Sequence, residues 1–247
     1  MALYLRPMKY ILKCLKINKK IILNTIEKKI SIIKSKIKNA SLKSQRNENE
    51  ITLLAVSKKK TTVEIHEAYN LGINNFGESF CQEAIEKIKN LKKLNIKWHF
   101  IGKIQSNKTK DIAEYFDWVH TIDRSKIAKR LSLYRPRNKQ PLNVCIQINQ
   151  GQEIHKGGLN QLDDLANLVN TIHNLPNLKL RGLMSIPPKI GSSKKYFSDL
   201  RMLKKTIIKN GFSLDTLSMG MSSDFEEAII EGSTIIRIGS SIFGKRL

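Results

Sequence analysis

The sequence lacks the features that mark membrane-spanning, secreted and disulfide-stapled proteins. It contains no run of ~18 consecutive apolar residues, which excludes an ordinary transmembrane helix. The first residues are interrupted by charges every few positions and show no clear cleavage site, so we expect no secretory signal. The chain has only three cysteines, Cys14, Cys81 and Cys145, widely spaced and odd in number. They predict neither a disulfide framework nor a zinc site, and they fit a reducing, cytoplasmic location.

Acidic residues are scarce as well. The 247 residues include 21 Asp and Glu against 44 Lys and Arg, a net charge of +23. Such an excess is typical of proteins that bind nucleic acids. However, 34 of the basic residues are lysines, whereas arginine is the usual reader of base edges, and no aromatic residues are interleaved with the basic run. We interpret the charge as compositional drift and expect no nucleic-acid partner. A basic protein that associates with nucleic acid or membrane is the alternative.

The basic excess is concentrated near the N-terminus, where the first 60 residues hold 16 Lys and Arg but three acids. We interpret residues 1–20 as a basic extension, either disordered or a start-site artefact with Met8 or a later codon as the true start. From Ile22 to Ile37, isoleucine recurs every three or four positions with lysines between, which predicts a basic helix. Its apolar stripe is expected to pack on the protein body; binding to a membrane surface, with no membrane partner otherwise expected, is the alternative.

Eight short apolar, β-rich runs then alternate with segments of helical spacing. The expected strands cover residues 52–56, 74–78, 97–102, 118–122, 143–149, 178–184, 216–220 and 234–239. The expected helices between them cover residues 62–71, 80–92, 124–134, 160–173, 194–210 and 223–231. This alternation predicts parallel βα units, an α/β fold. Eight units in a chain near the ~250 residues typical of a barrel most economically form a single (β/α)8 TIM barrel over residues 21–247. A doubly wound open sheet is the alternative.

In a βα barrel the working residues lie at the carboxyl ends of the strands. Lys58 follows the first expected strand, in the segment ITLLAVSK. Partial burial at a barrel mouth lowers the pKa of a lysine amine and leaves it free to attack a carbonyl carbon. The alternative is a lysine that extends from the strand end to water, as we expect for Lys59 and Lys60.

Two turns rich in glycine and serine follow the seventh and eighth expected strands. One reads SMGMS over residues 218–222, and the other is Gly239-Ser240-Ser241. Because the loops after strands 7 and 8 of such barrels frequently bind phosphate, the two turns predict a phosphorylated ligand. Arg237 alternates with apolar neighbours on the last strand, so its side chain faces either the mouth or the surrounding helices.

Four further polar residues lie on or just after expected strands. Glu78 and Asp123 each stand at a strand end, where they are either acids at the mouth or caps of the helices that follow. His99 and His120 lie within strands and show no metal-ligand spacing, so a hydrogen-bonded core histidine is the expected outcome for both.

These residues fall in a series of blocks that resembles the pyridoxal phosphate homeostasis proteins. The blocks read ITLLAVSK, FGES, WHFIGKIQSNK, VHTID, VCIQIN, RGLMSIP, LSMGMSSD and GSTIIRIGSSIFGKR, in order over roughly residues 22–247. The resemblance implies a single (β/α)8 barrel like the barrel domain of alanine racemases. It also implies binding of pyridoxal 5′-phosphate, a part in vitamin B6 homeostasis, and no established catalysis.

The resemblance further implies individual site residues. Lys58 corresponds to the Schiff-base lysine, and Arg237 to an arginine near the pyridine nitrogen. The other cofactor-binding residues that it assigns are Ser222, Gly239 and Ser240 for the phosphate, Ser218, Met219 and Gly220 in the same loop, and Asn75 and His99 on inner strands. Two positions depart from the family pattern: Ser79 replaces an asparagine and Lys103 replaces a proline.

The arginine argues against transamination and decarboxylation, although racemisation tolerates it. An arginine does not give up its proton at ordinary pH, so beside the ring nitrogen it would leave that nitrogen unprotonated and the electron sink weak. Racemases of this type add a C-terminal domain, and here the sequence ends eight residues after Gly239. We therefore predict a cytoplasmic, monomeric carrier or buffer of pyridoxal phosphate, without metal, whose partners are the cofactor and apoenzymes that depend on it. A racemase or lyase using the same cofactor is the alternative.

Overall fold

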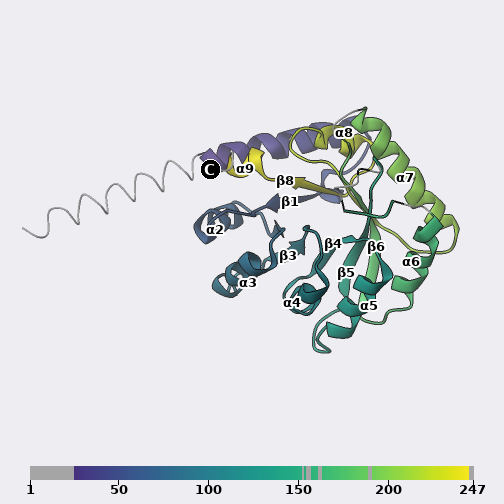
Figure 1. The fold of residues 1–247 in the computed structure, drawn as a ribbon. Helices are drawn as coiled ribbons and strands as arrows, with labels where there is room; N and C mark the ends of the chain where they lie inside the picture. The colour runs from purple at the N-terminus through teal and green to yellow at the C-terminus, as the bar shows by residue number, and fades with distance from the viewer. Residues whose placement is uncertain (1–24, 152, 154–156, 161–162, 189–190, 245–247) are drawn as a thin grey trace, which may run out of the picture.

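Eight parallel strands close into a barrel in their sequence order, and helices surround it (Figure 1). The computed structural model describes residues 25–151, 153, 157–160, 163–188 and 191–244. The strands are β1 Thr52–Val56, β2 Asn75–Glu78, β3 Lys97–Phe100, β4 Trp118–Ile122, β5 Leu142–Ile148, β6 Leu178–Ser185, β7 Thr216–Ser218 and β8 Ile235–Ile238. Each overlaps one expected strand, so the predicted (β/α)8 barrel is confirmed.

The helices follow the strands around the barrel. They are α2 Thr62–Asn70, α3 Cys81–Asn90, α4 Thr109–Tyr115, α5 Ser125–Tyr134, α6 Asp163–His173, α7 Ser193–Lys209, α8 Phe225–Ile230 and α9 Ser240–Phe243, with 3-10 turns η1 Glu48–Glu50 and η2 Ser106–Lys108. The sequence pattern predicted neither α4 nor α9, because seven and four residues are too few to establish a helical period.

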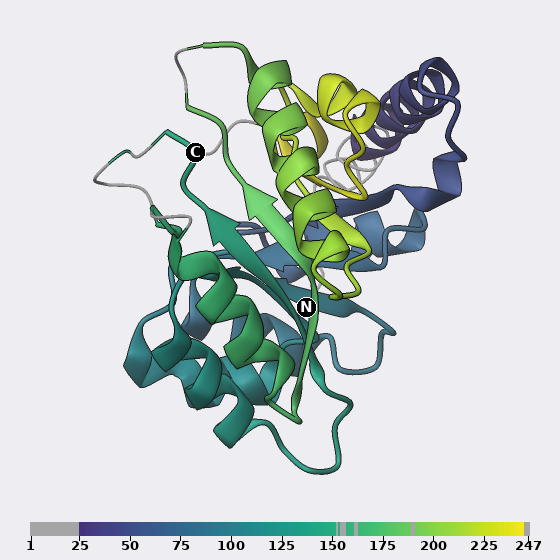
Figure 2. The same cartoon turned by 90° about the vertical axis from the view of Figure 1, so that its right-hand side faces the viewer.

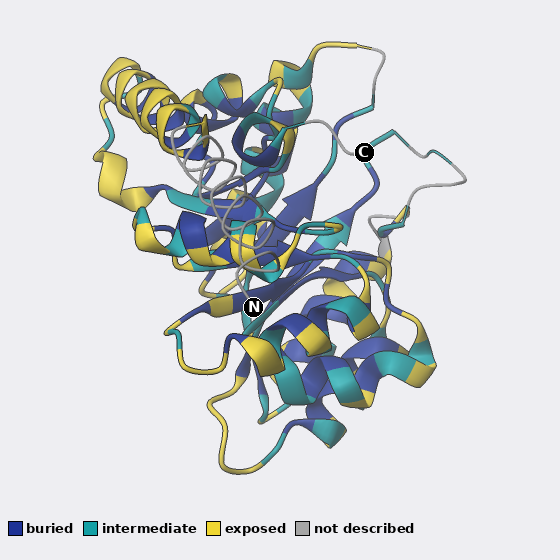
Figure 3. Cartoon of the chain, turned by 90° about the vertical axis from the view of Figure 1, so that its left-hand side faces the viewer, coloured by how far each residue is buried: buried dark blue, intermediate teal, exposed yellow. Residues whose placement is uncertain are grey.

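The pairing of the first and last strands closes the barrel and rules out the open sheet. Leu54 of β1 stands opposite Arg237 of β8, with Leu53 and Ala55 paired on either side of it. Because helices cover the outer face and side chains fill the interior, the strands are buried on both faces. Figure 3 shows the buried strands at the centre and exposed residues on the outer faces of the helices. Figure 2 shows the long helix α7 lying across β6.

The N-terminal helix covers residues 25–43 of the described chain and packs on the barrel. Ile26, Ile30, Ile33 and Ile37 are 3% to 6% exposed and belong to the same hydrophobic core as the strands. In Figure 1 this helix runs beside α9 and α8. The apolar stripe is therefore covered by protein, as predicted, and is not presented to a membrane; the predicted extension and Ile22 lie outside the described residues.

Two further predictions concern thiols and membrane spans. Cys81 and Cys145 are free and buried, and Cys14 lies outside the described residues. Across the described part of the chain, no helix combines the length and the apolar character that a membrane span requires.

Candidate functional site

A cavity of about 550 Å³ opens at the carboxyl ends of the strands. Lys58 after β1, Arg237 on β8, and Ser222, Gly239 and Ser240 in the last two loops all line it. These are the residues to which the sequence assigned the amine, the arginine and the phosphate contacts. The barrel brings them together because parallel strands place all their carboxyl ends at one rim.

The loop after β7 takes its shape from a glycine and a carboxylate. Gly220 has φ +92°, and a Cβ there would lie 2.6 Å from Ala228 Cβ, so a larger residue would be strained and crowded. The amide of Met221 donates to Asp224 Oδ1 at 2.6 Å, which closes the turn that carries Ser222. Burial raises the pKa of that Asp224 carboxyl.

The two predicted phosphate hydroxyls meet where the last two loops approach each other. Ser240 Oγ donates to Ser222 Oγ at 3.3 Å, and Gly239, which has no side chain, precedes Ser240. Two hydroxyls beside a bare backbone form a donor set that suits a tetrahedral oxyanion. Ser218 and Met219 of the same segment are fully buried below this rim, so they build the loop without lining the cavity.

Arg237 faces the barrel interior, which settles the orientation that the sequence left open. Its Nη1 donates to the carbonyl and the hydroxyl of Ser218 at 2.6 and 2.9 Å, and its Nη2 donates to the Ser185 carbonyl at 3.0 Å. Burial lowers the pKa of the guanidinium to about 10, so it is still a cation at neutral pH. The side chain is 5% exposed and its position is fixed by these three bonds.

The residue before Lys58 is held by a buried ionic group that we call the Glu78–Lys87 cluster (Ser57, Glu78, Glu83 and Lys87). Lys87 Nζ donates to Glu78 Oε1 and to the Ser57 carbonyl, both at 2.8 Å. The Ser57 hydroxyl donates to Glu78 Oε1 at 2.6 Å. Burial raises the pKa of the Glu78 carboxyl, against the opposing effect of Lys87. Glu78 is thus neither an acid lining the mouth nor a helix cap.

The residue after Lys58 is held by the same cluster. The amide of Lys59 donates to Glu83 Oε1 at 2.5 Å, and the same oxygen accepts from Lys87 Nζ at 2.6 Å. Lys59 has φ +60°, a conformation that costs a non-glycine residue free energy and persists only where its surroundings impose it. Lys58 therefore stands between two anchored neighbours.

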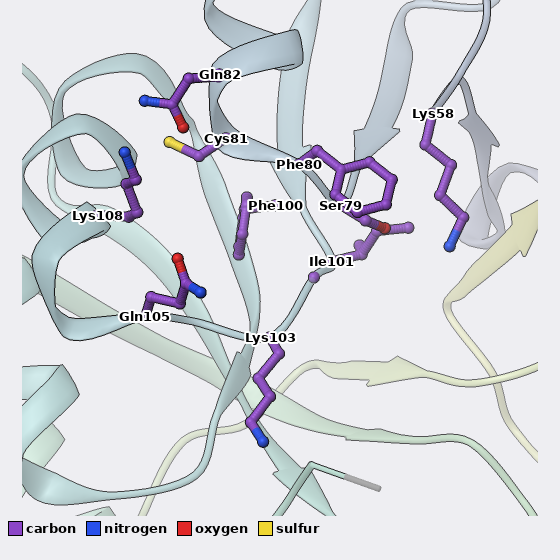
Figure 4. A pocket seen from close by; sticks show the side chains of 11 residues that line it. Lys58, Ser79, Phe80, Cys81, Gln82, Phe100, Ile101, Lys103, Gln105 and Lys108 are labelled. Carbon is purple, nitrogen blue, oxygen red and sulfur yellow. The ribbon is translucent and has the colours of Figure 1, made fainter. Parts of the chain in front are cut away.

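A second cavity, of about 530 Å³, lies beside the first, and both are lined by Lys58, Ser79 and Ile101 (Figure 4). Both departures from the family pattern border it, since Ser79 and Lys103 are among its lining residues. In Figure 4 Ser79 and the Phe80 ring lie between Lys58 and the remaining polar residues. The close approach here requires Gly102, because a Cβ at that position would lie 2.1 Å from the Ser79 carbonyl oxygen.

Asn75 and His99 lie away from the cavity at Lys58, contrary to the expectation that they line the pocket. Asn75 is the first residue of β2, at the end of the barrel opposite the mouth, and borders a separate cavity there with Lys34. His99 is buried in the barrel interior and hydrogen-bonded, as is His120. Both histidines are thus the bonded core residues that the strand pattern predicted. The alternation along a strand gives the inward face but not the depth.

Sequence reasoning missed the residues that hold the site from below. Lys87 lies on the buried face of α3 together with Cys81 and Ala84, and a lysine in an apolar helix stripe is a signal that could have been read.

Asp123 pairs with Arg124 at 2.5 Å and does not cap α5.

Comparison with known proteins places the chain in a family. The family model described as alanine racemase, N-terminal domain, matches residues 33–246. The pyridoxal phosphate homeostasis protein of Pseudomonas aeruginosa is 45% identical over 224 residues, 91% of this chain and 97% of its own. The protein of the same name from Escherichia coli is 44% identical over 230 residues, 91% and 98% of the two chains.

Solved structures agree with this result. PipY of Synechococcus elongatus, solved with pyridoxal phosphate bound, is 33% identical with a TM-score of 0.76, covering 89% of this chain and 100% of its own. Alanine racemase of Corynebacterium glutamicum shares the fold at 15% identity, with a TM-score of 0.69 over 91% of this chain and 61% of its own. With a matching family model, relatives about 45% identical over most of the chain and the same barrel, this chain belongs to the pyridoxal phosphate homeostasis protein family.

Proposed function

We propose that this protein binds pyridoxal 5′-phosphate at the mouth of the barrel and acts as an intracellular carrier or buffer of that cofactor. The observation that carries the proposal is one cavity lined by an amine, a buried guanidinium and the paired hydroxyls of Ser222 and Ser240. The cavity volume of about 550 Å³ lies within the ~300–1,000 Å³ range of small-molecule sites. These groups match an aldehyde, a ring nitrogen and a phosphate.

Each group has one task in this proposal. When bound, the cofactor supplies an aldehyde that condenses with the Lys58 amine, forming a C=N bond and releasing water. Ser222 and Ser240 donate hydrogen bonds to the phosphate. Three of the five N–H groups of Arg237 are used by protein oxygens, which leaves donors for an acceptor in the cavity that it lines.

We further propose that the protein does not catalyse amino-acid chemistry. A guanidinium held as a cation at the ring nitrogen offers no proton and weakens the electron sink that transamination and decarboxylation require. The relatives are named homeostasis proteins. In this proposal the protein is a cytoplasmic monomer that exchanges the cofactor with apoenzymes that depend on it.

The first experiment is an absorbance spectrum of the protein loaded with pyridoxal phosphate, before and after borohydride reduction, followed by peptide mapping. We expect a yellow band that reduction removes, and a modified peptide that contains Lys58. Lys58→Ala should lose the adduct, whereas Lys103→Ala, which removes an exposed amine of the neighbouring cavity, should keep it. A Lys58→Ala protein that retains its full covalent label would refute the site.

A second assay separates carrier from enzyme. The loaded protein is incubated with each enantiomer of alanine, serine and threonine, and separately with an apoenzyme that lacks the cofactor. We expect transfer of the cofactor to the apoenzyme and no turnover of the amino acids. Sustained racemisation or elimination above the rate of free pyridoxal phosphate would favour the racemase or lyase alternative.

A further inference from the structure

A continuous row of polar side chains, buried except for the half-buried Asn75, crosses the barrel interior from its base to Arg237. Asn75 Oδ1 lies 3.0 Å from His99 Nε2, and His99 Nδ1 lies 2.9 Å from His120 Nε2. His120 Nδ1 lies 2.7 Å from Ser218 Oγ, which accepts from Arg237 Nη1 at 2.9 Å. We call these five residues, contributed by β2, β3, β4, β7 and β8, the polar chain.

The direction of the bonds in the polar chain follows from the groups at its two ends. Arg237 only donates, so Ser218 Oγ accepts from it and keeps its own hydrogen and one lone pair for His120 Nδ1; because Asn75 Oδ1 at the far end can only accept, that hydrogen goes to Nδ1. A neutral His120 then carries its hydrogen on Nε2 and donates to His99 Nδ1. His99 in turn donates from Nε2 to the Asn75 carbonyl oxygen.

Contacts at the far end agree with this direction. Asn75 Nδ2 donates to Asn74 Oδ1 at 2.7 Å, which leaves the Asn75 carbonyl oxygen as the acceptor that His99 needs. The Trp118 ring stacks on the His99 ring with centroids 5.4 Å apart and planes 10° from parallel, which holds the plane of that imidazole. The contacts at the two ends of the polar chain therefore determine which ring nitrogen of each histidine carries the hydrogen. Moving that hydrogen to the other nitrogen of either ring would leave a buried donor or acceptor unpaired.

Burial keeps the two rings neutral. It lowers the pKa of His99 to about 3, and it lowers the pKa of His120 well below its usual value, with smaller contributions from His99 and Arg237. A neutral His120 presents a lone pair to Ser218, whereas a protonated one would present a second cationic donor beside the guanidinium.

We propose that His120 and His99 are positioning residues for Arg237: the hydrogen-bond direction that they impose turns the Ser218 hydroxyl hydrogen toward His120 and its lone pairs toward Arg237, and so holds the guanidinium at the wall of the cofactor cavity. The identity of the ligand rests on the function proposed above, but the direction of the polar chain does not. Asn75 then influences a cavity at the other end of the barrel through three intervening side chains.

The proposal is tested by replacing His120 in two ways. His120→Phe removes the acceptor of the Ser218 hydroxyl. We expect it to weaken binding of pyridoxal phosphate by about tenfold, the worth of one hydrogen bond to a charged group, and to shift the absorbance maximum of the bound cofactor. His120→Gln keeps an acceptor and a donor and should restore the maximum and most of the affinity. His66→Phe, at an exposed histidine of α2, should change neither.

Asn75→Leu extends the test to the far end. It should shift the same absorbance maximum in the same direction by a smaller amount, although its side chain does not border the cavity at Lys58. If His120→Phe folds as the parent does and keeps both the affinity and the absorbance maximum, the positioning role is refuted.

The third measurement is independent of the cofactor. Nitrogen NMR of the ligand-free protein should show two buried histidines as neutral rings with hydrogen on Nε2. Nδ1-protonated or cationic rings at neutral pH would refute the polar chain, even if His120→Phe fails to fold. If the parent does not bind pyridoxal phosphate but shows these tautomers, the proposed function fails while the internal arrangement holds.

Discussion

Lys58 and Arg237 line one cavity, but the side chains that hold them in place differ: those beneath Lys58 are charged, and those beneath Arg237 are neutral. Below Lys58, the Glu78–Lys87 cluster uses three ionised side chains. Below Arg237, the polar chain uses a hydroxyl, two neutral imidazoles and an amide. Burying a charge costs less when a partner charge is present, so the cluster pairs its ions. Arg237 instead keeps its own charge among carbonyl and hydroxyl dipoles, which leaves that charge available to a ligand.

The two supports also respond to pH with opposite sign. The pKa of His99 is lowered from 6.5 to about 3, so below 6.5 the unfolded chain binds a proton that the folded chain does not, and stability falls as pH falls. The pKa of Glu78 is raised above 4.5, so the folded carboxyl holds its proton longer than the unfolded one. That contribution to stability is lost as pH rises through the folded pKa.

The largest loss of stability is expected when the cation of the Glu78–Lys87 cluster is removed. Lys87→Met leaves Glu78 buried without its partner, and the free energy of unfolding should fall by about 3–5 kcal/mol. Urea denaturation measures it, with Lys92→Met at an exposed lysine as control. The double variant Glu78→Gln/Lys87→Met should lose much less. Equal losses in the single and double variants would show that packing, not charge, holds the Lys58 loop.

Measuring the free energy of unfolding over a range of pH tests the opposite pH dependences of the two groups. As pH falls below 6.5, each buried histidine of the polar chain should lower the free energy of unfolding by about 1.4 kcal/mol per pH unit. His99→Gln retains a donor and an acceptor but cannot titrate, so the difference between parent and variant isolates this effect between about pH 7 and pH 5. Parallel curves for the two proteins would mean that His99 titrates equally in both states and is not held neutral.

The smallest loss of stability is expected for a lysine–glutamate ion pair that is exposed to water on the protein surface. Lys36 Nζ and Glu226 Oε1 are 2.7 Å apart, nearly the distance of Lys87 from Glu78, but their side chains are 50% and 45% exposed. Lys36→Ala should lower the free energy of unfolding by less than about 1 kcal/mol, and added salt should shrink the difference. A loss as large as that of Lys87→Met would show that burial does not separate the two pairs.

The sequence predicted the parts of the site that depend on position along a strand. Alternation located the eight strands, and the strand ends then placed Lys58, Ser222, Gly239 and Ser240 at one rim. The rest depends on contacts between strands far apart in sequence. His120 and Ser218 are 98 positions apart and meet only because β4 and β7 face each other across the interior. Strand periodicity predicts which side chains share a face of the sheet. It does not predict how deep in the barrel a side chain lies or which residue it contacts. For this reason the facing of the Arg237 side chain stayed open, and Asn75 was expected at the cavity rather than at the opposite end of the barrel.

The pairing of β1 with β8 has a consequence for synthesis. The amine of the site follows the first strand and the hydroxyl of Ser240 follows the last, and the two strands are neighbours from Thr52 opposite Ile235 to Ala55 opposite Ile238. Until β8 has been synthesised the sheet is open, and the cavity lacks Arg237, Gly239 and Ser240. The cavity is thus complete only after β8 pairs with β1, and a ligand that recognises only the closed barrel would stabilise this pairing by mass action.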